Sequence, residues 1–134
     1  MIKEISNALM IDVYRKGWAL RYLREARAEL LAAQKMPYMA PGLMLEAMRK
    51  AQVAIYYSLG EPAFIEAIVH QTVGKKQIIE DPVLRCLVEI ERTIQKFSQT
   101  EDIEVNKAMQ HVDNLVQTAA EIVELFTEES SIQN

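Results

Sequence analysis

The most apolar stretch of the chain, residues 43–59, has apolar positions on every side of a helix. Twelve of its seventeen residues are apolar, and Gly60 follows as a helix stop. A helix that is apolar all round must be covered all round. We therefore predict a central helix here, against which the other elements pack, with Ala51 and Ile55 in the core.

Apolar residues spaced by three and four predict further helices on both sides of this stretch. Residues 2–35 read as one long helix or as two collinear ones, with an apolar stripe through Ala19, Leu23, Ala26, Leu30 and Ala33. Gly17 interrupts that pattern and is expected at a bend or at a close approach of another helix. Pro37 and Pro41 mark a break within residues 36–42 before the central helix begins.

The second half of the chain predicts one short helix and two long ones. Pro62 permits a helical start, and Gly74 ends that short segment. Asp81 before Pro82 predicts the cap of a long helix, and Thr100 with the acids after it predicts the cap of the last one. We expect an all-α fold, an up-and-down four-helix bundle with one extra short helix. Residues 1–134 form a single domain, and 128–134 are expected to fray.

Composition and charge narrow the class of protein. Half of the residues are hydrophobic and the net charge is −4, with +4 in residues 1–60 and −8 in residues 61–134. This asymmetry favours pairing of a basic face with an acidic face, within or between chains. The single cysteine, Cys86, is expected to be a buried, unreactive thiol in a cytoplasmic protein. We expect no membrane span and no signal peptide.

The sequence contains few polar residues in arrangements typical of a catalytic or metal-binding site. Glu66 and His70 are four residues apart and can share one helix face, and His111 stands among polar neighbours on the last helix. Di-iron bundles need Glu-x-x-His pairs, and zinc needs more Cys and His than this chain has, so we expect no metal and no cofactor. Glu66, His70 and His111 are retained as a possible polar site. The absence of a nucleophile or phosphate-loop motif favours a protein without catalytic activity.

Aromatic and methionine side chains gather in the first half of the chain, as they do at subunit contacts. We take Trp18, Tyr38, Met39 and Tyr56 as candidates for the interface of a homodimer, with ordinary core filling as the alternative. The first helix also carries a row of basic residues: Arg15, Lys16, Arg21, Arg24 and Arg27. Interspersed acids and the net negative charge argue against binding to a polyanion, so we expect no nucleic-acid partner.

Two stretches resemble the HEPN family of small, mostly prokaryotic helical-bundle domains: YLREARAELLAA (residues 22–33) and EAMRKAQVAIYYSLG (residues 46–60). The order of two long helices, a short one and two long ones is also that family's. The ribonucleases of this family carry Arg, four to six residues and then His. Neither His70 nor His111 has an arginine at that distance. The resemblance therefore implies a dimeric, non-catalytic member that binds a nucleotide, an RNA or a protein partner.

Two functions remain open. The first is a non-enzymatic cytosolic interaction or scaffolding protein that self-associates, with a protein partner as the alternative to a second copy. The second is a HEPN-like nucleotide- or RNA-binding module related to toxin–antitoxin systems, inactive or degenerate as a catalyst. Buried polar groups that converge on a cleft would favour ligand binding, whereas a filled core with a large apolar face would favour self-association.

Overall fold

The computed structural model describes the backbone of residues 2–100 and 102–132 and the side chains of residues 13–100 and 102–127. These residues form α-helices α1 (Ile2–Lys35), α2 (Ala40–Leu59), α3 (Pro62–Val73), α4 (Pro82–Gln99) and α5 (Val105–Ile132), with a 3₁₀ turn over Pro37–Met39. No strand occurs among them, so the all-α prediction is confirmed. The segment 128–134, for which we expect fraying, lies outside the residues whose side chains are described.

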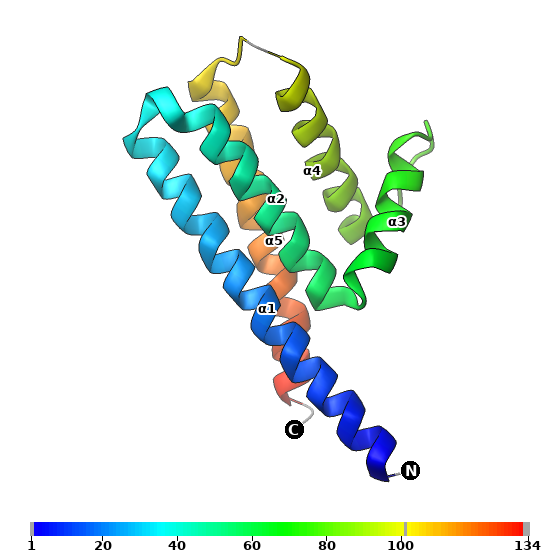
Figure 1. Ribbon diagram of the computed structural model, residues 1–134. Coiled ribbons are helices and arrows are strands. Elements are labelled where there is room, and N and C mark those ends of the chain that lie inside the picture. The colour runs from blue at the N-terminus through cyan, green and yellow to red at the C-terminus, as the bar shows by residue number, and fades with distance from the viewer. Residues whose placement is uncertain (1, 101, 133–134) are drawn as a thin grey trace.

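The long helices α1, α2, α4 and α5 run in alternating directions, and the short α3 packs beside α2 and α4 (Figure 1). Helix α2 contacts all of the other four helices, while α1 and α4 lie on opposite sides of it. This position explains why the sequence of α2 is apolar on every side. The predicted central helix and the up-and-down order of the bundle are both confirmed.

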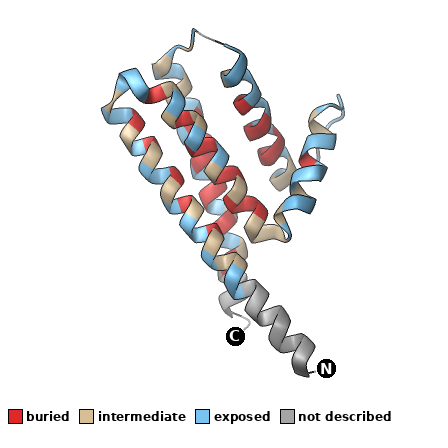
Figure 2. Cartoon of the chain, in the orientation of Figure 1, coloured by how far each residue is buried: buried red, intermediate tan, exposed pale blue. Residues whose placement is uncertain are grey.

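The core follows α2 along its length, as the buried positions in Figure 2 show. Ala51 and Ile55 have no exposed surface, as predicted, and the stripe of α1 from Ala19 to Ala33 is buried against them. Alanines at 47, 51 and 54 of α2 are all fully buried, which lets neighbouring helix backbones approach closely. Large side chains fill the rest: Met44, Met48, Leu87, Ile90, Val112 and Val123.

The local signals for helix ends are mostly confirmed. The Asp81 carboxylate accepts hydrogen bonds from the backbone N–H groups of Val83 and Leu84, at 2.8 and 3.0 Å, and so caps α4. The prediction for Thr100 is wrong, because its backbone is extended at the end of α4 and α5 begins only at Val105. The chain uses the residues between them to cross from one helix to the other.

Gly17 lies within one continuous helix, so α1 is a single element. A Cβ atom built at Gly17 would meet no heavy atom within 4 Å. The helix is therefore not interrupted at Gly17, the predicted close approach of another helix is absent, and this glycine lowers the helix propensity of α1.

Ion pairs join α1 to its neighbours within the bundle. The Lys50 ammonium of α2 bonds to Glu29 of α1, with Glu25 3.8 Å away, and all three residues lie in the basic part of the chain. Arg27 of α1 lies 3.2 Å from Glu124 of α5 and so joins the basic part to the acidic part. Some of the predicted charge complementarity is therefore satisfied inside one chain. None of the described helices is long and apolar enough to cross a membrane.

Candidate functional site

The four predicted interface residues lie in different places. Tyr38 and Met39 are 82% and 47% exposed in the turn between α1 and α2. Trp18 is half-buried on α1, seventeen residues before the end of that helix, or roughly 25 Å at 1.5 Å per residue. Tyr56 is only 3% exposed, so its assignment to a surface is wrong. It faces inward because α2 is covered on all sides.

Trp18 belongs to a cluster of aromatic rings shared by α1 and α2. Tyr57 of α2 stacks on Trp18 and on Tyr22 of α1, with ring centroids 6.3 and 5.9 Å apart. Tyr14 meets the Trp18 ring edge-on at 6.2 Å, and the Arg21 guanidinium lies 5.1 Å from its centre. These contacts join the two helices of the hairpin, and among the four aromatic rings only Tyr14, 60% exposed, presents a large surface to solvent.

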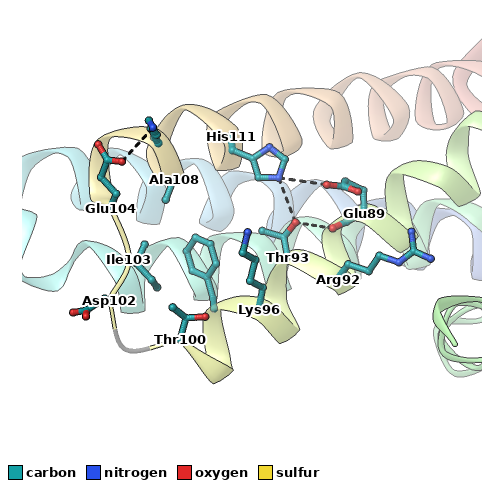
Figure 3. Close-up of a pocket in the computed structure, with 12 residues that line it drawn as sticks. Glu89, Arg92, Thr93, Lys96, Thr100, Asp102, Ile103, Glu104, Ala108 and His111 are labelled. Atoms are coloured by element: carbon teal, nitrogen blue, oxygen red, sulfur yellow. Dashed lines mark hydrogen bonds and ion pairs between the residues drawn. The ribbon is translucent and has the colours of Figure 1, made fainter.

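His111 lies in a groove of about 560 Å³ between α4 and α5 (Figure 3). Its Nε2 atom is 3.3 Å from the Thr93 hydroxyl and 3.5 Å from the Glu89 carboxylate. Thr93 is buried, but its hydroxyl donates to the Glu89 carbonyl of its own helix at 2.7 Å. The six charged residues of the groove balance, with three cations and three anions: Arg92, Lys96, Lys107, Glu89, Asp102 and Glu104. Because these charges balance, the rim of the groove favours neither an anionic nor a cationic ligand.

The Glu66–His70 pair of α3 faces Glu91 of α4, a residue that was not among the predicted site residues. The Nε2 atom of His70 is 3.2 Å from the Glu91 carboxylate and 3.9 Å from that of Glu66. Gln52 of α2 donates to the same Glu91 oxygen at 3.5 Å. Gln52 and Glu91 are 7% and 8% exposed, so two polar side chains from different helices meet in the interior. His111 is not part of this cluster.

These residues line a cavity of about 410 Å³ between α2, α3 and α4. Tyr56 also lines it, and the Tyr56 hydroxyl is buried without a hydrogen-bond partner among the described residues. Burial, followed by the negative charges of Glu91 and Glu66, raises the pKa of Tyr56, so its hydroxyl stays neutral. The other lining residues are Arg49, Val53, Tyr57, Pro62 and Ile94. We refer to this site as the α2–α3–α4 cavity.

The sequence does contain a pattern that indicates this cavity, namely polar residues at positions that their helices bury. Glu91 continues the apolar stripe of Leu84 and Val88 on α4, so a carboxylate occupies a position that the helix buries. Gln52 is similarly the one polar residue between Lys50 and Ser58. A charged or amide side chain in an apolar stripe indicates a buried polar contact, because burying such a group alone is costly.

Metal binding and thiol chemistry find little support in the described part of the chain. It contains no group of three His, Cys, Asp or Glu side chains placed to hold a metal ion. Cys86 is buried, as predicted, and burial together with the nearby charge of Glu89 raises the pKa of its thiol to about 11. Such a thiol is almost entirely protonated near neutral pH and is a poor nucleophile.

A scan against protein-family models and searches of curated proteins and of solved structures find no match to this chain.

Proposed function

We propose that this chain is a non-enzymatic interaction protein that associates with a second copy of itself through the outer side of α1. Among the described side chains of this helix, the large aliphatic ones that are exposed are Val13 by 68%, Leu20 by 36% and Leu31 by 52%. Positions 13, 20, 24, 27 and 31 are separated by seven, four, three and four residues, so they share one face with Arg24 and Arg27. This outer stripe of α1 is the observation that carries the proposal.

The charges beside the outer stripe favour a second copy as its partner. The contact between Arg27 and Glu124 places the stripe next to α5, which exposes Asp113, Glu121 and Glu124. A two-fold axis that runs between α1 and α5 would set the basic stripe of one copy against the acidic helix of the other. Each contact would then occur twice. Tyr38 and Met39, exposed near the same end of α1 as Leu31, remain candidates for this interface.

Sedimentation velocity from 1 to 100 µM tests this proposal. We expect a species of twice the 15.3 kDa chain mass that dissociates on dilution and at high salt. Leu31→Glu removes an apolar contact from the stripe and sets an anion against the acidic α5 of the other copy, so it should shift the equilibrium to monomer. Ile78→Glu, at a 93% exposed position outside the stripe, is the matched control and should not. A monomer over the whole range, or a dimer that Leu31→Glu leaves intact, contradicts the proposal.

The HEPN-like alternative, a nucleotide- or RNA-binding module, is supported by the order of helix lengths. Helices of 34 and 20 residues are followed by one of 12 and then by two of 18 and 28. The balanced charges of the groove that contains His111 argue against a polyanion there.

We predict that the purified protein does not cleave RNA, with or without divalent cations. The reason is that neither His70 nor His111 follows an arginine at the spacing that the family's ribonucleases share. Incubation with labelled RNA, followed by gel analysis, is the measurement. Cleavage that disappears in His111→Ala would contradict the prediction and favour the HEPN-like alternative.

A further inference from the structure

We propose that the α2–α3–α4 cavity binds a small organic cation, an amine or guanidinium compound whose charged end lies against Glu91. This inference goes beyond self-association and does not depend on it, since the cavity is on α2, α3 and α4 rather than on the outer stripe of α1. It rests on the burial, the hydrogen bonding and the charge of the residues that line the cavity.

Three polar residues of the cavity are more than nine-tenths buried. Gln52, Tyr56 and Glu91 have exposed fractions of 7%, 3% and 8%. Elsewhere in the described core, the buried hydroxyls of Thr93 and Thr127 donate to carbonyls of their own helices at 2.7 Å. Such local bonds are available to any helical threonine. The three cavity residues have no local partner of this kind, so they require a different explanation.

The hydrogen bonds of the cavity are incomplete. The Glu91 Oε1 atom accepts a long hydrogen bond from Gln52, at 3.5 Å, and is within hydrogen-bond distance of His70 Nε2, at 3.2 Å. The Tyr56 hydroxyl has no partner among the described residues. A buried hydroxyl without a partner destabilises the free protein, and a carboxylate that receives these two contacts on one oxygen can still accept further hydrogen bonds through its second oxygen. A bound group that carries several N–H donors and a positive charge would satisfy both of them.

The charges around the cavity select a cation. Glu91 and Glu66 supply two carboxylates, whereas Arg49 supplies the single permanently charged cation of the lining. The Arg49 guanidinium is engaged by Glu46, 3.4 Å away on the same helix. The side chains at the Glu91 end can all accept hydrogen bonds: the two carboxylates, the Gln52 carbonyl and the Tyr56 hydroxyl. An anion would face both carboxylates at close range, and this repulsion disfavours its binding.

The apolar part of the lining and the size of the cavity fit a small molecule. Val53, Pro62 and Ile94 provide an apolar wall, and Tyr57 adds an aromatic ring of the kind that attracts ammonium and guanidinium groups. A volume of about 410 Å³ lies within the range of small-molecule pockets, roughly 300 to 1,000 Å³.

Calorimetric titration and NMR titration of the full chain test the inference with three probes of similar length. The probes are 1,4-diaminobutane and agmatine, which carry ammonium and guanidinium groups, and uncharged 1,4-butanediol. We expect saturable binding of at least one cation, no binding of the diol, and resonance shifts centred on Gln52, Tyr56 and Glu91. Binding of neither cation up to 10 mM, or equal binding of the diol, overturns the inference.

Variants separate the cavity from general attraction to an acidic protein. Glu91→Gln keeps the shape of the side chain and should weaken cation binding by tenfold or more. Glu89→Gln removes the same charge from an exposed position two residues away and should change binding by less than twofold. Equal losses in the two variants would indicate non-specific attraction and would overturn the site.

Tyr56→Phe gives a readout that a merely structural role would not produce. It removes the hydroxyl without a partner, so the thermal midpoint of the free protein should stay the same or rise. Cation binding should weaken severalfold in the same variant. A lower midpoint with unchanged affinity would show that the hydroxyl serves only the fold and would contradict its role in the site.

Discussion

Ala51→Asp probes the central position of α2, because Ala51 has no exposed surface and stands in the middle of that helix. The new carboxyl would have no cation to pair with. The neighbouring Lys50 points to another side of the helix, since adjacent helical residues do not face each other, and it is already engaged by Glu29. The carboxyl must therefore be buried in its neutral form or force the helices apart.

The expected loss of stability can be worked from two contributions. Keeping an Asp carboxyl neutral at pH 7, about 3 units above its ordinary pKa, costs about 4 kcal/mol at 1.36 kcal/mol per unit. Forcing the extra atoms into a filled core adds about 1–3 kcal/mol. The sum of about 5–7 kcal/mol is comparable to the whole free energy of unfolding of a small domain, about 5–15 kcal/mol. We expect the variant to be largely unfolded or barely stable at neutral pH.

The pH dependence gives this prediction a second signature. Burial holds the folded-state pKa of the new carboxyl above its unfolded value, so the ionisation penalty is full at neutral pH and disappears as the pH falls to about 4. Urea titrations followed by circular dichroism should therefore show a penalty smaller by about 2.7 kcal/mol at pH 5 than at pH 7.

Ala67→Asp on the exposed side of α3 is the matched control, since it carries the same loss of helix propensity, about 0.5–0.7 kcal/mol, without burial. A midpoint for Ala51→Asp near that of the parent would refute the reasoning. So would a penalty independent of pH, because it would mean that water reaches this side of α2.

Three smaller changes test other features. Asp81→Ala removes two capping hydrogen bonds from α4 and should lower the free energy of unfolding by about 1 kcal/mol in urea titration, and no loss would mean that water replaces the cap. Gly17→Ala should raise the free energy of unfolding by about 0.5–1 kcal/mol, because a Cβ there meets open space, whereas a loss would indicate a close approach to α1. The pKa of Cys86 is raised by burial to about 11, so the contribution of its neutral thiol is full below pH 9 and lost as the pH rises through about 11. Stability should fall over this range, less steeply in Cys86→Ser, and the folded thiol should react slowly with thiol reagents at pH 8.

The helices could be predicted from the sequence because each of them is indicated by a local pattern of residues. The apolar run of α2, the cap at Asp81 and the stripe of α1 from Ala19 to Ala33 each depend on residues within one or two helical turns. The error at Thr100 has the same origin. A residue that resembles a cap by type can equally end the preceding helix, and only the path between α4 and α5 decides which of these occurs.

Only part of the candidate site could be predicted from the sequence, because the site is formed by the packing of three helices. Glu66 and His70 share one helix, and their spacing of four residues selects them. That Glu91 of α4 and Gln52 of α2 lie against His70 and each other follows from how the helices pack. Tyr56 was assigned wrongly for the same reason. Tyrosine is common at interfaces, but the other helices enclose α2 and bury this one.

The enclosure of α2 has a consequence for the order in which the chain can mature during synthesis. Helix α1 can pair with α2 as soon as residues 40–59 leave the ribosome, and this pairing involves contacts between segments close in sequence. Another side of α2 is covered by α5, whose residues are made some fifty to seventy positions later. A nascent chain that stops before Val105 therefore presents the most apolar surface of the protein to its surroundings. At synthesis rates of about 5–20 residues per second, this exposure lasts for several seconds, long enough for a chaperone to act.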